Sequence, residues 1–153
     1  MTTIEESVEV AVPLRTAYDQ WTQFEEFPRF MEGVESVTQA DATHLHWVAS
    51  FGGARREWDA EITEQVPDER VAWASRGGTR NAGVVTFHRL DDTSTRVMLQ
   101  LDVEPEGLVE QTGDKLGFIK RRASGDLDRF KDFIESRGTE TGAWRGEVRN
   151  WDN

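Results

Sequence analysis

The sequence predicts an α+β fold in which seven antiparallel strands form one sheet that packs against a single long C-terminal helix. Apolar and polar residues alternate at the N-terminus and again in six closely spaced segments between residues 34 and 104, which is the period of strands. After Pro105 apolar residues recur every three or four positions, which is the period of a helix. The apolar face of a sheet and the apolar stripe of a helix are both buried when the two pack together.

The N-terminal part of the chain is predicted to form a strand and then a short helix. Residues 4–12 alternate between apolar and polar side chains, as in a strand with one face in water. Pro13 is compatible with a first helical turn, and the sequence LRTAYDQW that follows it has an apolar stripe from Leu14 to Trp21. A short apolar turn around Pro28 comes next.

Six further strands are separated by turn residues. Turns this short join antiparallel neighbours, because parallel strands need crossovers of about a dozen residues or more. The predicted strands are residues 34–39, 43–51, 55–66, 70–76, 81–90 and 94–104. The apolar face of the last strand consists of Thr95, Val97, Leu99, Leu101 and Val103.

The C-terminal helix is predicted to extend for about 30 residues, or roughly 45 Å, and to end at Gly138. Its apolar stripe consists of Leu116, Ile119, Ala123, Leu127, Phe130 and Ile134. Its polar face is interpreted as solvated and carries Lys120, Arg121, Asp126, Asp128, Arg129 and Lys131. We therefore expect one domain over residues 1–138 and a tail over residues 139–153.

Composition and charge argue against several classes of function. The chain has 153 residues, the size of one domain, and its net charge of -11 is the opposite of a nucleic-acid or anionic-membrane footprint. There are no cysteines, so disulfides and thiolate metal sites are excluded. No apolar run approaches the roughly 20 residues of a membrane span. The N-terminal MTTIEESVEV lacks the basic and apolar regions of a signal peptide, so we expect a cytoplasmic protein.

The order of these elements and three segments of the chain resemble a known superfamily. The segments are EWDAEITEQVPDERVAWAS at 57–75, AGVVTFHRL at 82–90 and GDLDRFKDFIESRG at 125–138. Over about residues 3–137 the chain resembles the START and polyketide cyclase/dehydrase superfamily (SRPBCC), and TETGAWRGEV after the third segment is similar to a bacterial cyclase/dehydrase-like subgroup. The resemblance implies the helix-grip fold, in which a curved seven-stranded sheet wraps around the C-terminal helix and two short helices follow the first strand. Members of the superfamily include lipid carriers, quinone-binding proteins, aromatase/cyclases and plant hormone receptors.

A curved sheet around one helix leaves an apolar space between them, and concave apolar spaces bind small molecules. The resemblance places the two short helices beside the mouth of that space, so their aromatic residues form its wall or lid; the alternative is that they only plug the core. Trp58 is predicted to point inward, whereas the direction of Trp73 depends on the register of the GGTRN hairpin. The candidate ligand-binding residues are Phe24, Phe27, Phe30, Met31, Trp47, Trp58, Trp73, Phe87, Leu116 and Ile119.

Candidates for catalysis are few. His88 lies in the middle of a predicted strand, where a half-buried imidazole could act as an acid or base near neutral pH; a structural histidine is the alternative. Arg76 or Arg89 could polarise a carbonyl group. His44 and His46 share a face, and a carboxylate such as Asp59 or Glu61 could complete a metal site with them. This pattern is generic, so we predict no metal and no cofactor.

The tail contains Trp144 and Trp151, which predicts docking on the domain itself or, alternatively, in a homodimer. Three functions are consistent with the sequence. The first is a carrier or sensor that binds a hydrophobic small molecule such as a lipid, a quinone or a polyketide-like aromatic compound. The second is an aromatase/cyclase or dehydrase acting on a polyketide, with His88 as the acid or base. The third is a non-catalytic interaction module with a filled core.

Overall fold

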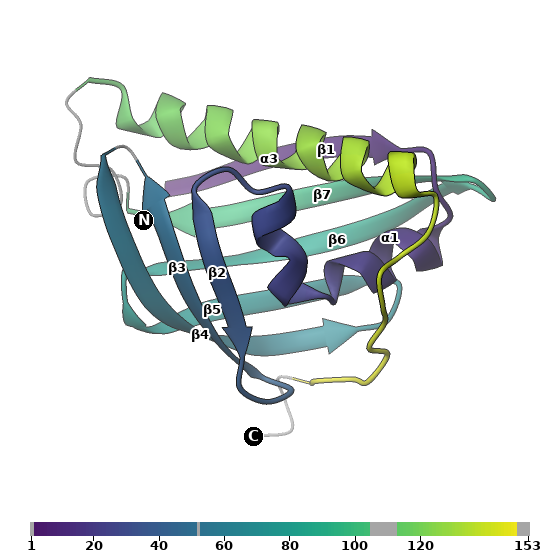
Figure 1. Ribbon diagram of the computed structural model, residues 1–153, viewed down its shortest axis with the longest axis horizontal. Helices are drawn as coiled ribbons and strands as arrows, with labels where there is room; N and C mark the ends of the chain where they lie inside the picture. The colour runs from purple at the N-terminus through teal and green to yellow at the C-terminus, as the bar shows by residue number, and fades with distance from the viewer. Residues whose placement is uncertain (1, 52, 105–112, 150–153) are drawn as a thin grey trace.

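The computed structural model describes residues 2–51, 53–104 and 113–149, and it confirms the predicted α+β fold (Figure 1). One curved antiparallel sheet has the strand order β1-β7-β6-β5-β4-β3-β2, and α3 lies across its open side. The strands are β1 Thr2–Val10, β2 Val34–Gln39, β3 His44–Phe51, β4 Ala54–Val66, β5 Arg70–Gly78, β6 Asn81–Asp91 and β7 Ser94–Val103. The helices are α1 Leu14–Trp21, the 3-10 helix η1 Phe24–Arg29, and α3 Lys115–Arg137.

The two short helices connect the two edges of the sheet. Strand β1 forms one edge beside β7, and β2 forms the other edge beside β3. Helices α1 and η1 lie between β1 and β2 in the chain, so they must cross the concave side of the sheet. This crossing places the aromatic residues of η1 between the sheet and α3.

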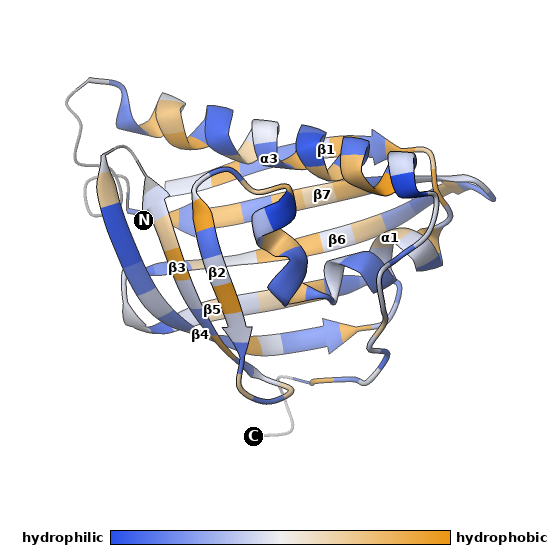
Figure 2. Ribbon diagram, in the orientation of Figure 1, coloured by the Kyte–Doolittle hydropathy of each residue, from blue (hydrophilic) through white to orange (hydrophobic). Residues whose placement is uncertain are grey.

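The hydrophobic core occupies the space between the concave face of the sheet and α3. Figure 2 shows hydrophobic and hydrophilic residues alternating along the strands. The predicted stripe of α3 is buried at Ile119, Ala123, Leu127, Phe130 and Ile134, and Leu116 is partly buried. None of the helices within the described ranges is long and apolar enough to span a membrane.

Helix α3 is shorter than predicted, with 23 residues and a length of about 35 Å. It begins after Asp114, whose side chain accepts a hydrogen bond of 2.8 Å from the backbone N–H of Gly117. A Cβ at Gly117 would lie 2.2 Å from this carboxylate, so glycine makes room for the cap. The helix ends at Gly138 in the left-handed conformation, as predicted. The part of the predicted helix over residues 105–112 lies outside the described residues.

Aromatic contacts join the helices to the sheet. The ring of Trp21 lies 5.2 Å from Phe27, 5.1 Å from Phe130 and 6.4 Å from Phe87, measured between ring centroids. Phe30 contacts Phe130 at 5.3 Å. One cluster therefore holds α1, η1, α3 and strand β6 together.

The tail folds back onto α1, and its yellow trace leaves the end of α3 in Figure 1. Arg145 Nη1 lies 2.5 Å from Asp19 Oδ1, and its Nη2 lies 2.8 Å from Asp68 Oδ2. Val148 and Gln65 exchange two backbone hydrogen bonds of 2.8 and 2.9 Å. The tail therefore docks on its own domain, which was the first of the two predictions. Trp144 stays 37% exposed, and Trp151 lies outside the described residues.

Replacing Arg145 with Met should lower the free energy of unfolding by about 3 kcal/mol, because it removes a partner from a buried carboxylate. Asp19 is 1% exposed. Its other ionic partner is Arg15, whose Nε lies 3.5 Å from Asp19 Oδ2 and whose side chain is mostly solvated. Urea denaturation at pH 7 measures the change. The control is Arg80→Met, which breaks an exposed 3.5 Å pair with Glu104 and should cost less than about 1 kcal/mol. Equal losses in the two variants would contradict this account of the tail.

Candidate functional site

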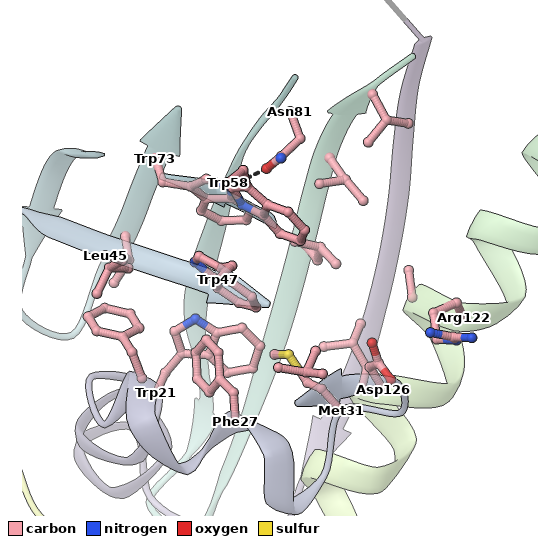
Figure 3. Close-up of a pocket in the computed structure, with 18 of the residues that line it drawn as sticks. Trp21, Phe27, Met31, Leu45, Trp47, Trp58, Trp73, Asn81, Arg122 and Asp126 are labelled. Atoms are coloured by element: carbon pink, nitrogen blue, oxygen red, sulfur yellow. Dashed lines mark hydrogen bonds between the residues drawn. The ribbon is translucent and has the colours of Figure 1, made fainter. Parts of the chain in front are cut away.

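A cavity of about 140 Å³ lies between the concave face of the sheet and α3. Figure 3 shows tryptophans from the sheet on one side of it and Arg122 and Asp126 from α3 on the other. Its aromatic wall consists of Trp21, Phe24, Phe27, Trp47, Trp58 and Trp73. Polar side chains enter the lining only at Asn81, Arg122 and Asp126, so the cavity is almost entirely apolar within the described part of the chain.

Three tryptophans on consecutive strands build the sheet side of the cavity. Trp47 and Trp58 are directly opposite in the register of β3 and β4, and their rings stack at 5.6 Å with an interplanar angle of 10°. Trp73 is opposite Gly83, where a Cβ would lie 2.7 Å from its ring, so the indole lies over the glycine. Its Nε1 donates a 3.1 Å hydrogen bond to Asn81 Oδ1. The register thus settles the direction that the sequence left open: Trp73 points inward.

Seven of the ten candidate ligand-binding residues line this cavity. They are Phe24, Phe27, Met31, Trp47, Trp58, Trp73 and Ile119. Phe30 and Phe87 are buried in the aromatic core instead, and Leu116 packs beside Ile4 and Val103 in a separate cluster. The two alternatives for η1, cavity wall and core plug, therefore do not exclude each other. Phe24 and Phe27 are buried in the core and also line the cavity.

The carboxylate of Asp126 lines the cavity from α3. Its Oδ1 accepts a 3.0 Å hydrogen bond from the backbone N–H of Glu32 and one of 2.5 Å from Arg129 Nη2. Burial raises the pKa of Asp126, and the hydrogen bond from Arg129 opposes this rise. The interpretation of Asp126 as part of a solvated face was wrong.

Arginines on the same side of α3 bind backbone carbonyls at the end of η1, in the loop that follows it and in β3. Arg122 Nη1 donates to the carbonyl oxygens of Glu32 at 2.8 Å and Ser50 at 3.2 Å, and Arg129 Nε donates to Phe30 O at 3.0 Å. The sequence holds a signal for this arrangement, since residues 122, 126 and 129 each directly precede a residue of the apolar stripe. Such positions flank the buried face of a helix and are within reach of its neighbours.

The structure places His88 away from the cavity. Phe87 points inward, so the alternation of β6 turns His88 outward, where it is exposed and its Nε2 lies 2.9 Å from Thr86 Oγ1. Of the two alternatives for His88, the half-buried acid or base is contradicted, because the imidazole is exposed on the outer face of the sheet. Arg76 pairs with Glu61 at 2.6 Å and Arg89 pairs with Asp92, both on the exposed surface.

His44 and His46 share the outer face of β3, as predicted, but each is engaged by carboxylates. His46 Nδ1 lies 2.7 Å from Asp59, and its Nε2 lies 2.8 Å from Glu57. His44 Nδ1 lies 2.9 Å from Asp41. Among the described residues, no three His, Asp or Glu side chains are arranged to hold a metal ion.

Comparison with known proteins identifies the family. Residues 10–132 match the family model described as polyketide cyclase / dehydrase and lipid transport. The protein belongs to this family. Over 149 residues it is 62% identical to the uncharacterized 17.2 kDa protein in the melC2-rnhH intergenic region of Streptomyces lincolnensis, covering 97% of this chain and 99% of that protein.

Solved structures similar to this member of the polyketide cyclase/dehydrase and lipid transport family confirm the helix-grip fold. DR_A0006 from Deinococcus radiodurans is 25% identical, with a TM-score of 0.69 over 90% of this chain and 99% of that one. The Zhui aromatase/cyclase from Streptomyces sp. R1128 is 17% identical, with a TM-score of 0.72 over 94% of this chain and 99% of that one. A START superfamily protein from Mycobacterium smegmatis is 18% identical, with a TM-score of 0.67 over 88% of this chain and 95% of that one. At these identities the last two support the fold alone.

The pKa of His46 should be measurable above its ordinary value of 6.5, because Asp59 and then Glu57 favour the imidazolium form. The ion pairs then stabilise the fold fully below about pH 6.5, and this contribution is lost as pH rises through the folded-state pKa. The side chain is 42% exposed, so the contribution stays below about 1 kcal/mol.

An NMR titration of the imidazole protons measures this pKa directly. Asp59→Asn should lower the titration midpoint of His46, whereas Asp92→Asn, an exposed carboxylate on another hairpin, should leave it unchanged. A midpoint for His46 at or below 6.5 in the unaltered protein would be inconsistent with the charge pairing.

Proposed function

We propose that the protein binds a hydrophobic small molecule in the cavity between the sheet and α3. The observation that carries this proposal is an apolar cavity of about 140 Å³ in an otherwise filled core. Protein interiors contain few voids larger than a water molecule, so an apolar cavity of this volume is unusual in a filled core. A bound apolar molecule would cover its apolar wall, which supports a binding role over a purely structural one.

The ligand classes consistent with the apolar wall are a lipid, a quinone or a polyketide-like aromatic compound. The family description, which names both cyclase/dehydrase activity and lipid transport, supports the same range. We infer a cytoplasmic carrier or sensor, with the location resting on the sequence alone. The tail docks on its own domain. A homodimer through the tryptophans of the tail remains a prediction, and light scattering would test it by measuring the molar mass in solution.

A residue that fills the cavity should abolish binding. Leu99 is partly buried, lines the cavity from β7 and can be replaced by Trp, whereas Gln100→Trp puts the same side chain on the opposite face of the same strand. Native mass spectrometry of protein purified from its natural host should show a retained small molecule in the unaltered protein and the Gln100→Trp variant. Leu99→Trp should lose it. Retention of the same molecule by Leu99→Trp would place the binding site elsewhere.

A second candidate function, proton transfer within an aromatase/cyclase or dehydrase reaction, is supported by Asp126. This carboxyl lines the cavity, and burial moves its pKa toward neutrality, as suits a general acid or base. As the base, the carboxylate would take a proton from a carbon next to a carbonyl group of the bound molecule. The electron pair of the broken C–H bond would form the enolate, whose carbon can attack a second carbonyl group.

Deuterium exchange at the methyl group of acetophenone in D₂O tests this step without knowledge of the natural substrate. The protein should accelerate the exchange, and Asp126→Asn should reduce the acceleration by at least about 100-fold. The amide keeps an oxygen that can accept the Glu32 N–H, so the loop remains attached. Asp128→Asn, an exposed position two residues further along α3, is the matched control. Exchange no faster than in buffer would count against the enzyme function and leave the binding function intact.

A further inference from the structure

One border of the cavity lies between two elements that do not pair through their backbones. Residues 30–33 connect η1 to the edge strand β2, and Met31 in this loop lines the cavity. Arg122 and Asp126 line the cavity from α3. Figure 3 shows Met31 and Asp126 on the same side of the cavity. The loop and the helix therefore meet along a border of the enclosed space.

Side chains of α3 hold the backbone of this loop at several points. The N–H of Glu32 donates to Asp126 Oδ1 at 3.0 Å, and its carbonyl oxygen accepts from Arg122 Nη1 at 2.8 Å. Arg129 Nε donates to Phe30 O at 3.0 Å, and Arg129 Nη2 lies 3.6 Å from Glu32 Oε2. Three residues on one face of α3 therefore close this border of the cavity.

The bonds at this border are more accessible to water than the rest of the cavity wall. The side chains of Glu32 and Arg129 are 64% and 39% exposed, and ion pairs at such positions contribute little because water competes for them. The sheet is held by backbone hydrogen bonds between neighbouring strands, and Phe27 and Trp58 of the aromatic wall are buried. Local opening occurs where contacts are few and solvated, so this border should open before the others.

Gly33 ends the loop in a conformation that side chains disfavour. Its φ is +82°, and an added Cβ would lie 2.4 Å from Ser50 O and 2.6 Å from Arg122 Nη1. The carbonyl oxygen of Gly33 also accepts a 2.8 Å hydrogen bond from Ser50 N. Glycine thus lets the loop approach both β3 and α3 closely enough for the bonds to Glu32 to form.

We propose that residues 30–33 form a gate that Arg122, Asp126 and Arg129 hold closed against α3, and that opening of this gate sets the rate of ligand exchange. The cavity is partly open to solvent with the gate closed, and separation of the loop from the helix would widen its mouth. This inference rests on the proposed binding function and concerns how a ligand enters and leaves that same cavity. The gate controls the rates of exchange and leaves the apolar surface that contacts the ligand unchanged.

Arg129→Met removes the bonds of this side chain to the gate and keeps an apolar stem. Stopped-flow fluorescence with the neutral dye N-phenylnaphthylamine, which is brighter in apolar surroundings, measures the exchange. Association and dissociation rate constants should both rise about threefold to tenfold, the range for one lost hydrogen bond. The dissociation constant should change less than twofold, because these bonds hold the gate and not the dye. Arg121→Met, at an exposed position of the same helix, should change neither rate.

Gly33→Ala tests the gate from the loop side, because its Cβ would push the loop away from Ser50 and Arg122. Both rate constants should rise again. Gly138→Ala is the matched control, since Gly138 also has a positive φ, of +74°, but no atom lies within 4 Å of an added Cβ. Hydrogen exchange of the unaltered protein needs no variant to fold: the Glu32 amide should exchange faster than the amides of β6.

The outcomes separate the gate from the function on which it rests. Unchanged rate constants in Arg129→Met and Gly33→Ala, or a Glu32 amide that exchanges as slowly as those of β6, would overturn the gate and leave hydrophobic binding intact. Weaker binding with an unchanged association rate would make the loop part of the binding surface and would also contradict the gate. No binding of the dye by the unaltered protein, together with no molecule retained from the host, would overturn both proposals.

Discussion

The contacts of Trp21 are the constraint on which the rest of the structure depends. This side chain ends α1 and touches η1 through Phe27, α3 through Phe130 and the sheet through Phe87. An antiparallel sheet twists on its own and bends at bulges such as the two in β4, but three elements held against one indole fix the depth at which α3 lies. The same contact positions η1, and η1 supplies part of the cavity wall. Fold and site therefore share one aromatic cluster.

The cavity exists because α3 fills the concavity unevenly. Toward its C-terminal end, Phe130 and Ile134 are completely buried, and Phe130 meets the aromatic cluster. One turn before Leu127 the buried stripe carries Ala123, whose small side chain lines the cavity and leaves volume that a larger residue would occupy. Leu99 on β7 is consequently less buried than its neighbour Val97, although both lie on the same face of the strand. A small residue on the helix thus leaves a cavity in part of the core.

The fold could be predicted from the sequence because burial of one face gives strands and helices each a regular spacing of apolar residues. It could not predict features that depend on contacts between distant residues. The direction of Trp73 required the register that places it opposite Gly83, and the start of α3 required the Asp114 cap at Gly117. The facing of His88 could not be predicted either, because a one-residue shift in register reverses which face of a strand is buried. Periodicity likewise says nothing about where the tail docks, because its contacts are made by single residues such as Arg145 and Val148.

The polar residues of α3 connect the two functions considered for the cavity. Asp126 holds the loop at Glu32 and forms part of the wall, so one carboxyl is both a structural acceptor and a candidate acid or base. Its pKa is raised by burial, so its contribution to stability is complete below the unfolded-state pKa and is lost as pH rises through the folded-state pKa. The fold thus favours the protonated carboxyl more than water does. In Figure 3 the tryptophans of the sheet and Asp126 of α3 lie on opposite sides of the cavity, so a molecule bound between them would face this carboxyl.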